Sequence, residues 1–139
     1  MTLLHIASAV AIGERAILIE GEAGTGKSSL ALALIDRGAV LIGDDGVALA
    51  TKGTHLLASN PPNITGLIEV RNVGLVHRQT VSGIPVALVL RLDPEAPRYI
   101  EEAERTVLAG IDLPLVRLWP DSPVLALRAE AALALYGEG

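Results

Sequence analysis

Residues 16–28 of this chain read Ala16-Ile17-Leu18-Ile19-Glu20-Gly21-Glu22-Ala23-Gly24-Thr25-Gly26-Lys27-Ser28, and this stretch decides the fold. Its first four residues are apolar and predict a buried strand. Its last eight match the phosphate-loop pattern G-x-x-x-x-G-K-[ST]. Residues 28–35 predict a helix, so the motif stands between a strand and a helix, which is the context that it requires.

The chemistry of such a loop is the binding of phosphates. Glycines let the backbone curl so that several N–H groups point inward, and the N-terminus of the following helix adds partial positive charge. Lys27 would reach the outer phosphates, and the Ser28 hydroxyl would bind magnesium. The alternative is a glycine-rich turn with one exposed lysine. The pattern favours a nucleotide site made of Gly21, Glu22, Ala23, Gly24, Thr25, Gly26, Lys27, Ser28 and Ser29.

Length and composition limit the possible classes of protein. With 139 residues we expect one domain, residues 1–139, with an aliphatic core, since only Tyr99, Trp119 and Tyr136 are aromatic. The chain has no cysteine, which excludes disulfides and thiolate chemistry. A net charge of −5 argues against nucleic acid or an anionic membrane as partner. Without a membrane-length apolar run or a leader pattern, we expect a cytoplasmic protein.

The pattern along the chain predicts an α/β fold with a mixed β-sheet, one face of which is covered by the helix after the phosphate loop. Residues 3–12 and the strand ending at Glu20 read as a hairpin, and Gly38 suits the end of the helix. The remaining predicted elements are a strand at 39–42, a hairpin at 47–58, a loop at 60–63, a strand at 84–91, and helices at 97–108 and from Ser122 to Tyr136.

Two acids, Asp44 and Asp45, follow the predicted strand at 39–42. An acid at such a strand end commonly helps to hold magnesium in phosphate-loop proteins. Two adjacent carboxylates could divide metal binding and proton acceptance between them. An acidic turn is the alternative, because Asp-Asp-Gly also suits a turn. Beside a phosphate loop, the functional interpretation is favoured.

Two other features carry candidate side chains. Glu69 and Arg71 would share one face of an extended strand, either as a structural ion pair or as a magnesium ligand and a phosphate-binding guanidinium. His5 lies in an apolar strand, where a lone histidine is more often structural than catalytic. It has no metal-ligand spacing with His55 or His77, so zinc is not expected.

Taken in order, these residues resemble a known family. The order is His5, the loop from Gly21 to Ser28, Arg37-Gly38, Asp44-Asp45, Pro61-Pro62 and Gly66-Leu67-Ile68-Glu69-Val70-Arg71. It resembles the C-terminal catalytic domain of HPr kinase/phosphorylase, and the resemblance is dense from His5 to about Leu75. The resemblance implies a phosphate-loop fold related to the nucleotide-binding core of phosphoenolpyruvate carboxykinase, assembly as a homo-oligomer (a hexamer in that family) and a cytoplasmic location.

The resemblance also implies an activity and roles for residues. The family transfers phosphate from ATP, with Mg2+, to a serine of the phosphocarrier protein HPr in phosphotransferase-system regulation, and it removes that phosphate by phosphorolysis. By resemblance, Asp44 would be the catalytic base, His5 would orient it, and Lys27 would hold phosphates. Ser28 and Glu69 would coordinate magnesium, with support from Asp45. An arginine that neutralises the transferring phosphate would be Arg71, Arg98 or Arg105.

The chain departs from the family pattern at three places. It lacks the long form's preceding domain, which suggests the short single-domain form. Arg71-Asn72-Val73-Gly74 stands where the family has Arg-Gly-Leu-Gly, and residues 118–123 lack a Gly-Arg-Asn segment. The leading hypothesis is therefore a serine kinase acting on an HPr-like protein. The alternatives are a non-catalytic ATP-sensing module and a small-molecule kinase; the sequence does not identify the acceptor.

Overall fold

The computed structural model describes residues 2–62 and 66–139, and its central feature is the strand that precedes the glycine-rich loop. This strand, β3 (Arg15–Glu20), is buried along Ala16–Ile19. It pairs antiparallel with β2 (Ser8–Ile12) through the turn at Gly13 and parallel with β9 (Ile84–Leu92). The predicted hairpin therefore forms with residues 8–12, whereas residues 2–5 form a separate strand that pairs with the strand at 47–52. The glycine-rich loop then leads into α1 (Lys27–Asp36), which confirms the predicted strand–loop–helix order.

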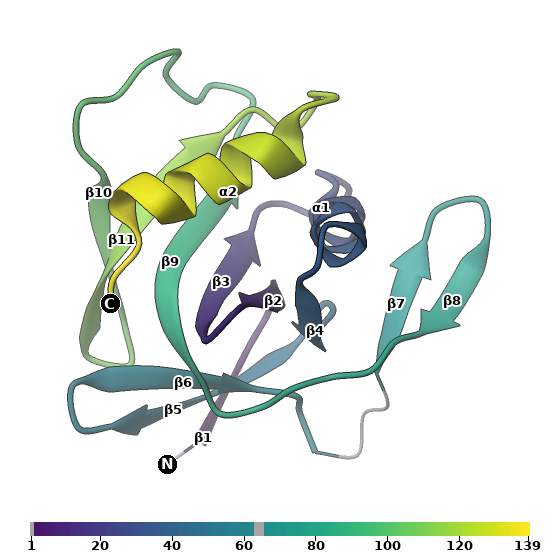
Figure 1. Cartoon of the computed structure of the whole chain (residues 1–139), viewed down its shortest axis with the longest axis horizontal. Helices are drawn as coiled ribbons and strands as arrows, with labels where there is room; N and C mark the ends of the chain where they lie inside the picture. The colour runs from purple at the N-terminus through teal and green to yellow at the C-terminus, as the bar shows by residue number, and fades with distance from the viewer. Residues whose placement is uncertain (1, 63–65) are drawn as a thin grey trace.

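The other elements complete a mixed, curled sheet with two helices on one face and a separate hairpin at the side (Figure 1). These elements are β1 (Thr2–His5), β4 (Val40–Gly43), β5 (Val47–Lys52), β6 (His55–Ser59), β7 (Leu67–Val70), β8 (Gly74–His77), β10 (Glu104–Leu108), β11 (Ile111–Leu118) and α2 (Leu125–Tyr136). The predicted loop residues Asn60 to Pro62 lie outside any helix or strand, and Asn63 lies outside the described residues.

The sheet runs in the order β1-β5-β6-β9-β3-β2-β4, and β11 pairs parallel with the C-terminal half of β9. Strands β3, β9 and β11 are therefore parallel neighbours, and all three end at one edge of the sheet. The segments that follow them begin at Gly21, Asp93 and Trp119. Ligands of open α/β sheets bind at the carboxyl ends of parallel strands, so this edge is where a site is expected.

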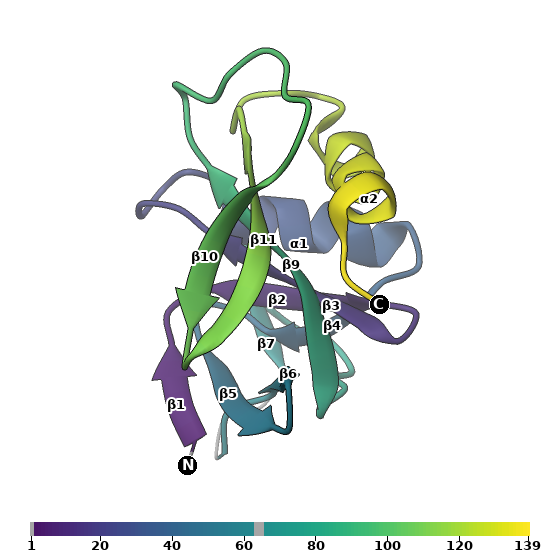
Figure 2. The same ribbon diagram turned by 90° about the vertical axis from the view of Figure 1, so that its left-hand side faces the viewer.

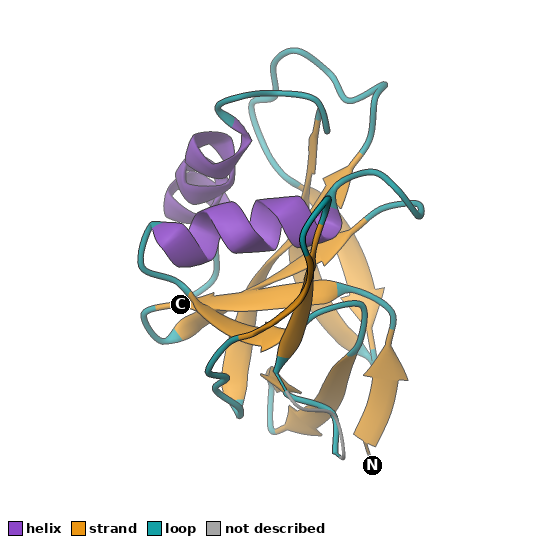
Figure 3. Cartoon of the chain, turned by 90° about the vertical axis from the view of Figure 1, so that its right-hand side faces the viewer, coloured by secondary structure: helices purple, strands orange, loops and turns teal. Residues whose placement is uncertain are grey.

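Alternation along β3 divides the apolar interior into two clusters. Ile17 and Ile19 face the helices, where they pack with Leu34 of α1 and Leu133 of α2. Ala16 and Leu18 face the opposite way, into the curl of the sheet. This two-residue period is the period of a strand buried on both faces. Figure 3 shows both helices on the same side of the sheet, as predicted for α1.

The helix predicted at 97–108 is wrong. Residues 93–103 form no helix or strand, and β10 pairs antiparallel with β11 (Figure 2). A two-residue turn joins them, with Ala109 at φ 50° and Gly110 at φ 81°. Such hairpin turns need left-handed backbone at both positions and usually carry Asn-Gly or Asp-Gly. Alanine in the first position concealed the hairpin.

A smaller difference concerns the C-terminal part. The last helix begins at Leu125 rather than at Ser122, although Ser122 shapes its entry, since its Oγ accepts a hydrogen bond from Val124 N–H at 3.1 Å. Trp119 is 39% exposed and donates a hydrogen bond from Nε1 to the Ala96 carbonyl. Within the described residues, no helix has the length and apolar character needed to cross a membrane.

Candidate functional site

The loop from Gly21 to Lys27 is held by its own hydrogen bonds. Thr25 donates to the Glu22 carbonyl from both its backbone N–H, at 3.2 Å, and its side-chain Oγ1, at 2.7 Å. Gly24 and Gly26 have φ values of 82° and 99°, which residues with a Cβ rarely adopt. The glycines of the motif are therefore required by the path of the backbone.

The N-terminus of α1 is open towards this loop. Gly26 precedes the helix and no side chain caps it. The first N–H groups of a helix have no partner inside the helix, and together with the helix dipole they attract anions. Lys27 lies beside them, and its Nζ now donates to the carbonyls of Gly21 and Glu22 at 2.7 and 3.2 Å. The loop thus gathers positive charge at one end of α1.

Asp44 is the centre of the polar side of the site. Its Oδ1 accepts hydrogen bonds from the hydroxyls of Ser8, at 2.8 Å, and Ser28, at 2.6 Å. Its Oδ2 accepts a hydrogen bond from the backbone N–H of Glu69 at 3.1 Å. One carboxylate therefore joins β2, the start of α1, and the β7–β8 hairpin. The predicted neighbourhood of Ser28, Asp44 and Glu69 is observed.

The other predicted acids are placed differently from Asp44. Asp45 is exposed, and its φ of 56° makes it the left-handed residue of the turn. The Glu69 carboxylate forms an ion pair with Arg71 at 3.1 Å, and both side chains are more than half exposed. Glu69 lies in β7, but Arg71 lies just beyond it in the hairpin turn. The two side chains therefore do not share the expected face of a strand and meet at the turn instead.

These groups surround a cavity of about 330 Å³. The residues that line it come from the β1–β2 connection, the glycine-rich loop, the start of α1, the turn after β4 and the β7–β8 hairpin: Ile6, Gly21, Ala23, Gly24, Gly26, Lys27, Ser28, Ser29, Asp44, Asp45, Glu69 and Arg71. Most of the site residues expected from the sequence are among them. Glu22 and Thr25 shape the loop beside this cavity instead, as the bonds above show.

The donor set fits magnesium. Hydroxyl and carboxylate oxygens are the ligands of this hard cation, which usually takes one or two carboxylates and completes its shell with water and phosphate oxygens. Within the described residues, no three His, Asp or Glu side chains converge to hold a metal by themselves. Any magnesium here would therefore complete its coordination with water or phosphate oxygens.

His5 is bound to a different acid from the one expected. Its Nε2 lies 2.8 Å from Glu20 Oε2, so in this structure it orients Glu20 and not Asp44. Arg91 also donates to Glu20, from Nη2 at 2.7 Å. Glu20 directly precedes the glycine-rich loop, so this trio ties β1 and β9 to the strand that carries the loop. Any influence of His5 on the loop would pass through Glu20.

The Glu20 carboxyl has a perturbed pKa. Burial alone would raise its pKa, but the hydrogen bonds and charges of His5 and Arg91 outweigh burial and lower the pKa below 4.5. A lowered pKa in the folded state means that ionised Glu20 stabilises the fold at pH values above 4.5. This contribution is lost as the pH falls through the folded-state value.

We expect Glu20→Gln to destabilise the protein at pH 7 by about 1–3 kcal/mol, because Arg91 loses its charged acceptor. The difference from the parent protein should shrink as the pH falls below 4.5. Urea unfolding of both proteins between pH 3 and pH 7 measures this, with Glu14→Gln in an exposed turn as control. A difference that does not change with pH would contradict the role assigned to the Glu20 charge.

The remaining arginine candidates lie away from the cavity around Asp44. Arg105 pairs with Asp112 at 2.7 Å and with Glu138 at 3.5 Å, and these contacts raise its pKa. Arg98 lines another pocket, with Arg117, Trp119 and Arg128. Of the three predicted arginines, Arg71 is the one that lines the cavity.

Sequence reasoning missed three residues of this region. Ser8 is fully buried and donates to Asp44, and Glu20 and Arg91 form the pair described above. A serine inside an otherwise apolar strand was a signal, since a buried hydroxyl needs a partner. Nothing local pairs Glu20 with Arg91, which are brought together only by the parallel register of β3 and β9.

Comparison with known proteins agrees with this geometry. Residues 2–88 match the family model described as "HPr Serine kinase C-terminal domain". Among curated relatives, the HPr kinase/phosphorylase of Chlorobium chlorochromatii is 36% identical over 116 residues, which are 73% of this chain and 35% of that protein. The HPr kinase/phosphorylase of Nitrosomonas europaea is 30% identical over 130 residues, which are 88% of this chain and 40% of that protein.

A solved structure, that of the Hpr(Ser) kinase/phosphatase from Coxiella burnetii, superposes with a TM-score of 0.83 at 28% identity. The match covers 95% of this chain and 88% of that one, so the mixed sheet and both helices have counterparts. This chain spans about 35–40% of the length of the curated relatives that it matches.

Proposed function

The chain belongs to the HPr serine kinase C-terminal domain family, and from this premise we propose that it is an ATP- and magnesium-dependent kinase for a serine of an HPr-like phosphocarrier protein. The observation that carries the proposal is the position of Asp44. Its carboxylate lines the same cavity as Lys27 and the open N-terminus of α1, and it accepts a hydrogen bond of 2.6 Å from Ser28 at the start of that helix. A base and a phosphate-binding site thus face the same space.

We assign the steps as follows. The loop N–H groups and Lys27, once turned away from the Gly21 and Glu22 carbonyls, bind the phosphates of ATP. Asp44 accepts the proton of the acceptor serine as the serine oxygen attacks the γ-phosphorus, and the bond between that phosphorus and the bridging oxygen of ADP breaks. Arg71 stabilises the charge that spreads over the transferring group. Phosphoryl transfer mostly requires in-line positioning, charge neutralisation and a nearby base.

Magnesium would be held by Ser28 and the neighbouring carboxylates of Asp45 and Glu69, and it would neutralise phosphate charge. The same residues would serve phosphorolysis, in which inorganic phosphate attacks the phosphorus of phosphoserine, the bond to the serine oxygen breaks, Asp44 returns a proton to that oxygen, and pyrophosphate leaves. We treat residues 1–139 as one catalytic unit.

The surface around the cavity suits a protein substrate or a second copy of the chain. Ile6 lines the cavity and is 73% exposed, and Val73 and Leu75 of the adjoining hairpin are 73% and 67% exposed. Exposed apolar side chains grouped around a site are typical of interaction surfaces. We therefore place the phosphocarrier here and propose that the protein assembles as a homo-oligomer.

The test is direct. The purified chain is incubated with ATP, magnesium and a panel of HPr proteins, and intact-mass spectrometry follows the addition of one phosphate. We expect phosphoserine on at least one HPr and none when magnesium is removed by EDTA. Tight ATP binding without transfer to any HPr would overturn the kinase proposal and favour a nucleotide-sensing module.

A further inference from the structure

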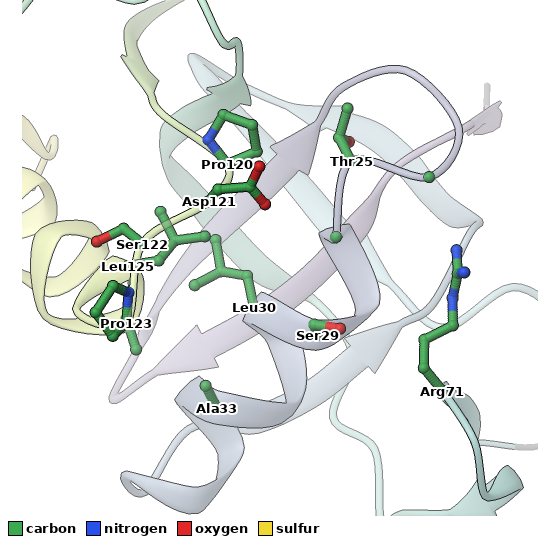
Figure 4. Close-up of a pocket in the computed structure, with 13 residues that line it drawn as sticks. Thr25, Ser29, Leu30, Ala33, Arg71, Pro120, Asp121, Ser122, Pro123 and Leu125 are labelled. Carbon is green, nitrogen blue, oxygen red and sulfur yellow. The ribbon is translucent and has the colours of Figure 1, made fainter.

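A second cavity, of about 370 Å³, adjoins the one around Asp44. Its walls are the glycine-rich loop and α1 on one side, and the segment Pro120–Ala126 on the other (Figure 4). Gly24, Gly26, Ser29 and Arg71 line both cavities. A ligand bound in one cavity can therefore extend into the other.

The two cavities differ in chemistry. The first contains Lys27, the open helix end and two serines. The second is lined by the apolar side chains of Leu30, Ala33, Pro120, Pro123, Leu125 and Ala126. Its polar residues are Thr25, Ser29 and Arg71 on the side of the glycine-rich loop and the first cavity, and Asp121 and Ser122 on the opposite wall. The Asp121 carboxylate points into the space facing Thr25 (Figure 4) and makes no hydrogen bond or ion pair within the described part of the chain.

The fold explains why these segments meet. The segment 119–124 follows β11 directly, and β11 ends at the same edge as β3, two strands away. Asp93 N–H donates to the Leu118 carbonyl at 2.9 Å, which fixes the exit of β11 beside the exit of β9. The Ser122 hydroxyl is used to hold the entry to α2, so within the segment 119–124 Asp121 is the charged group directed into the cavity.

We propose that this second cavity holds the nucleoside part of the nucleotide, an inference that rests on the proposed function. The negative charge of Asp121 disfavours phosphate and favours a neutral group rich in hydroxyls. The ribose hydroxyls donate to the Asp121 carboxylate, and the base packs among the apolar side chains. A cavity of this size lies within the range of about 300–1,000 Å³ typical of small-ligand sites.

Binding measurements with the whole chain test the proposal. Magnesium ATP, magnesium tripolyphosphate and magnesium 2′,3′-dideoxyATP are compared by calorimetry. We expect ATP to bind roughly tenfold or more tightly than tripolyphosphate, because the apolar cavity is filled only by ATP. We expect ATP to bind about tenfold more tightly than dideoxyATP, because the hydrogen bonds to a charged acceptor are lost.

Two variants localise the effect. Ala126→Phe fills the cavity and should weaken ATP by at least about tenfold while leaving tripolyphosphate affinity unchanged. Ala131→Phe, at an exposed position of the same helix outside the cavity, is the matched control. Asp121→Ala, on an exposed loop, should remove the preference for ATP over dideoxyATP. The fluorescence of Trp119, the single tryptophan of the chain, gives a second measurement of ligand binding, because Trp119 directly precedes Pro120 in the cavity wall.

The outcomes separate this inference from the proposed function. Equal affinity for ATP and tripolyphosphate, or an Ala126→Phe variant that binds ATP normally, would overturn the nucleoside site while the phosphate site stands. An Ala126→Phe variant that binds ATP normally but loses transfer to HPr would assign the cavity to the protein substrate instead. Binding of neither ATP nor tripolyphosphate would overturn the proposed function itself, and the nucleoside site with it.

Discussion

Asp44→Asn is expected to lower the rate of phosphoryl transfer by about 10²–10⁴-fold, the usual contribution of a general base. The affinity for magnesium ATP should change much less, because the loop and Lys27 bind the phosphates. The variant removes the charge and the proton-accepting capacity of the side chain while keeping its shape. Single-turnover transfer to HPr and calorimetry with ATP measure the two quantities separately.

The hydrogen bonds around Asp44 make Asn a well-matched replacement. The Glu69 N–H can only donate, so the amide oxygen of Asn must face it. The amide NH2 then faces the hydroxyls of Ser8 and Ser28, which can accept as well as donate. All three contacts survive, and the fold should be retained.

A control variant completes this experiment. Asp36→Asn makes the same chemical change at an exposed position near the end of α1, and it should leave transfer unchanged. Thermal unfolding of the two variants should agree with that of the parent protein. Equal losses of ATP affinity and of transfer in Asp44→Asn would show that Asp44 binds the nucleotide complex and is not the base.

The sequence predicted the part of this site that is formed by residues close together in the chain. A strand, a glycine-rich loop and a helix N-terminus follow one another without interruption from Ala16 to Ser28, so local pattern specifies the phosphate-binding half. Asp44 could be added because acids at strand ends are a recurrent feature of such folds. The predicted strands at 39–42, 47–58 and 84–91 are confirmed for the same reason, since each is a clear apolar run.

What the sequence did not predict depends on pairing between distant segments. The partner of His5 is Glu20 because the β2–β3 hairpin pairs Ser8 with Ile19, which brings the end of β1 beside the end of β3, and the sequence predicted this hairpin without its register. The hairpin of β10 and β11 was read as a helix because Ala109 occupies a left-handed position that usually carries Asn or Asp. The wall formed by residues 120–126 could not be anticipated, since it needs β11 to lie beside β9.

Gly43→Ala is expected to destabilise the protein and to lower the transfer rate as well. Gly43 is the last residue of β4, and the turn through Asp44 and Asp45 folds back over it. A Cβ at position 43 would overlap the backbone carbonyl oxygen of Gly46. Because a backbone atom cannot move aside as a flexible side chain can, the turn itself must shift.

Overpacking of this kind typically costs about 1–3 kcal/mol. For a chain of this length, that corresponds to a decrease of roughly 3–10 °C in Tm. The shift also displaces Asp44 from Ser8 and Ser28, whose hydroxyls lie 2.8 and 2.6 Å from its carboxylate. Transfer should therefore fall even at temperatures where the variant is fully folded, since a small misplacement of a catalytic group is costly.

Gly46→Ala provides the matched control in the same turn. A Cβ at position 46 would find Leu4 Cδ1 at 3.9 Å and Pro61 Cγ at 4.0 Å, which are ordinary contacts, and the backbone there is not left-handed. We expect this variant to keep the Tm and the transfer rate of the parent protein within experimental error. If both variants kept the Tm and the transfer rate of the parent protein, the turn could relax around the added Cβ. The inference that the end of β4 holds Asp44 rigidly would then be wrong. If Gly43→Ala alone lowered both the Tm and the rate of phosphoryl transfer, the result would establish that the geometry of this turn holds Asp44 in place.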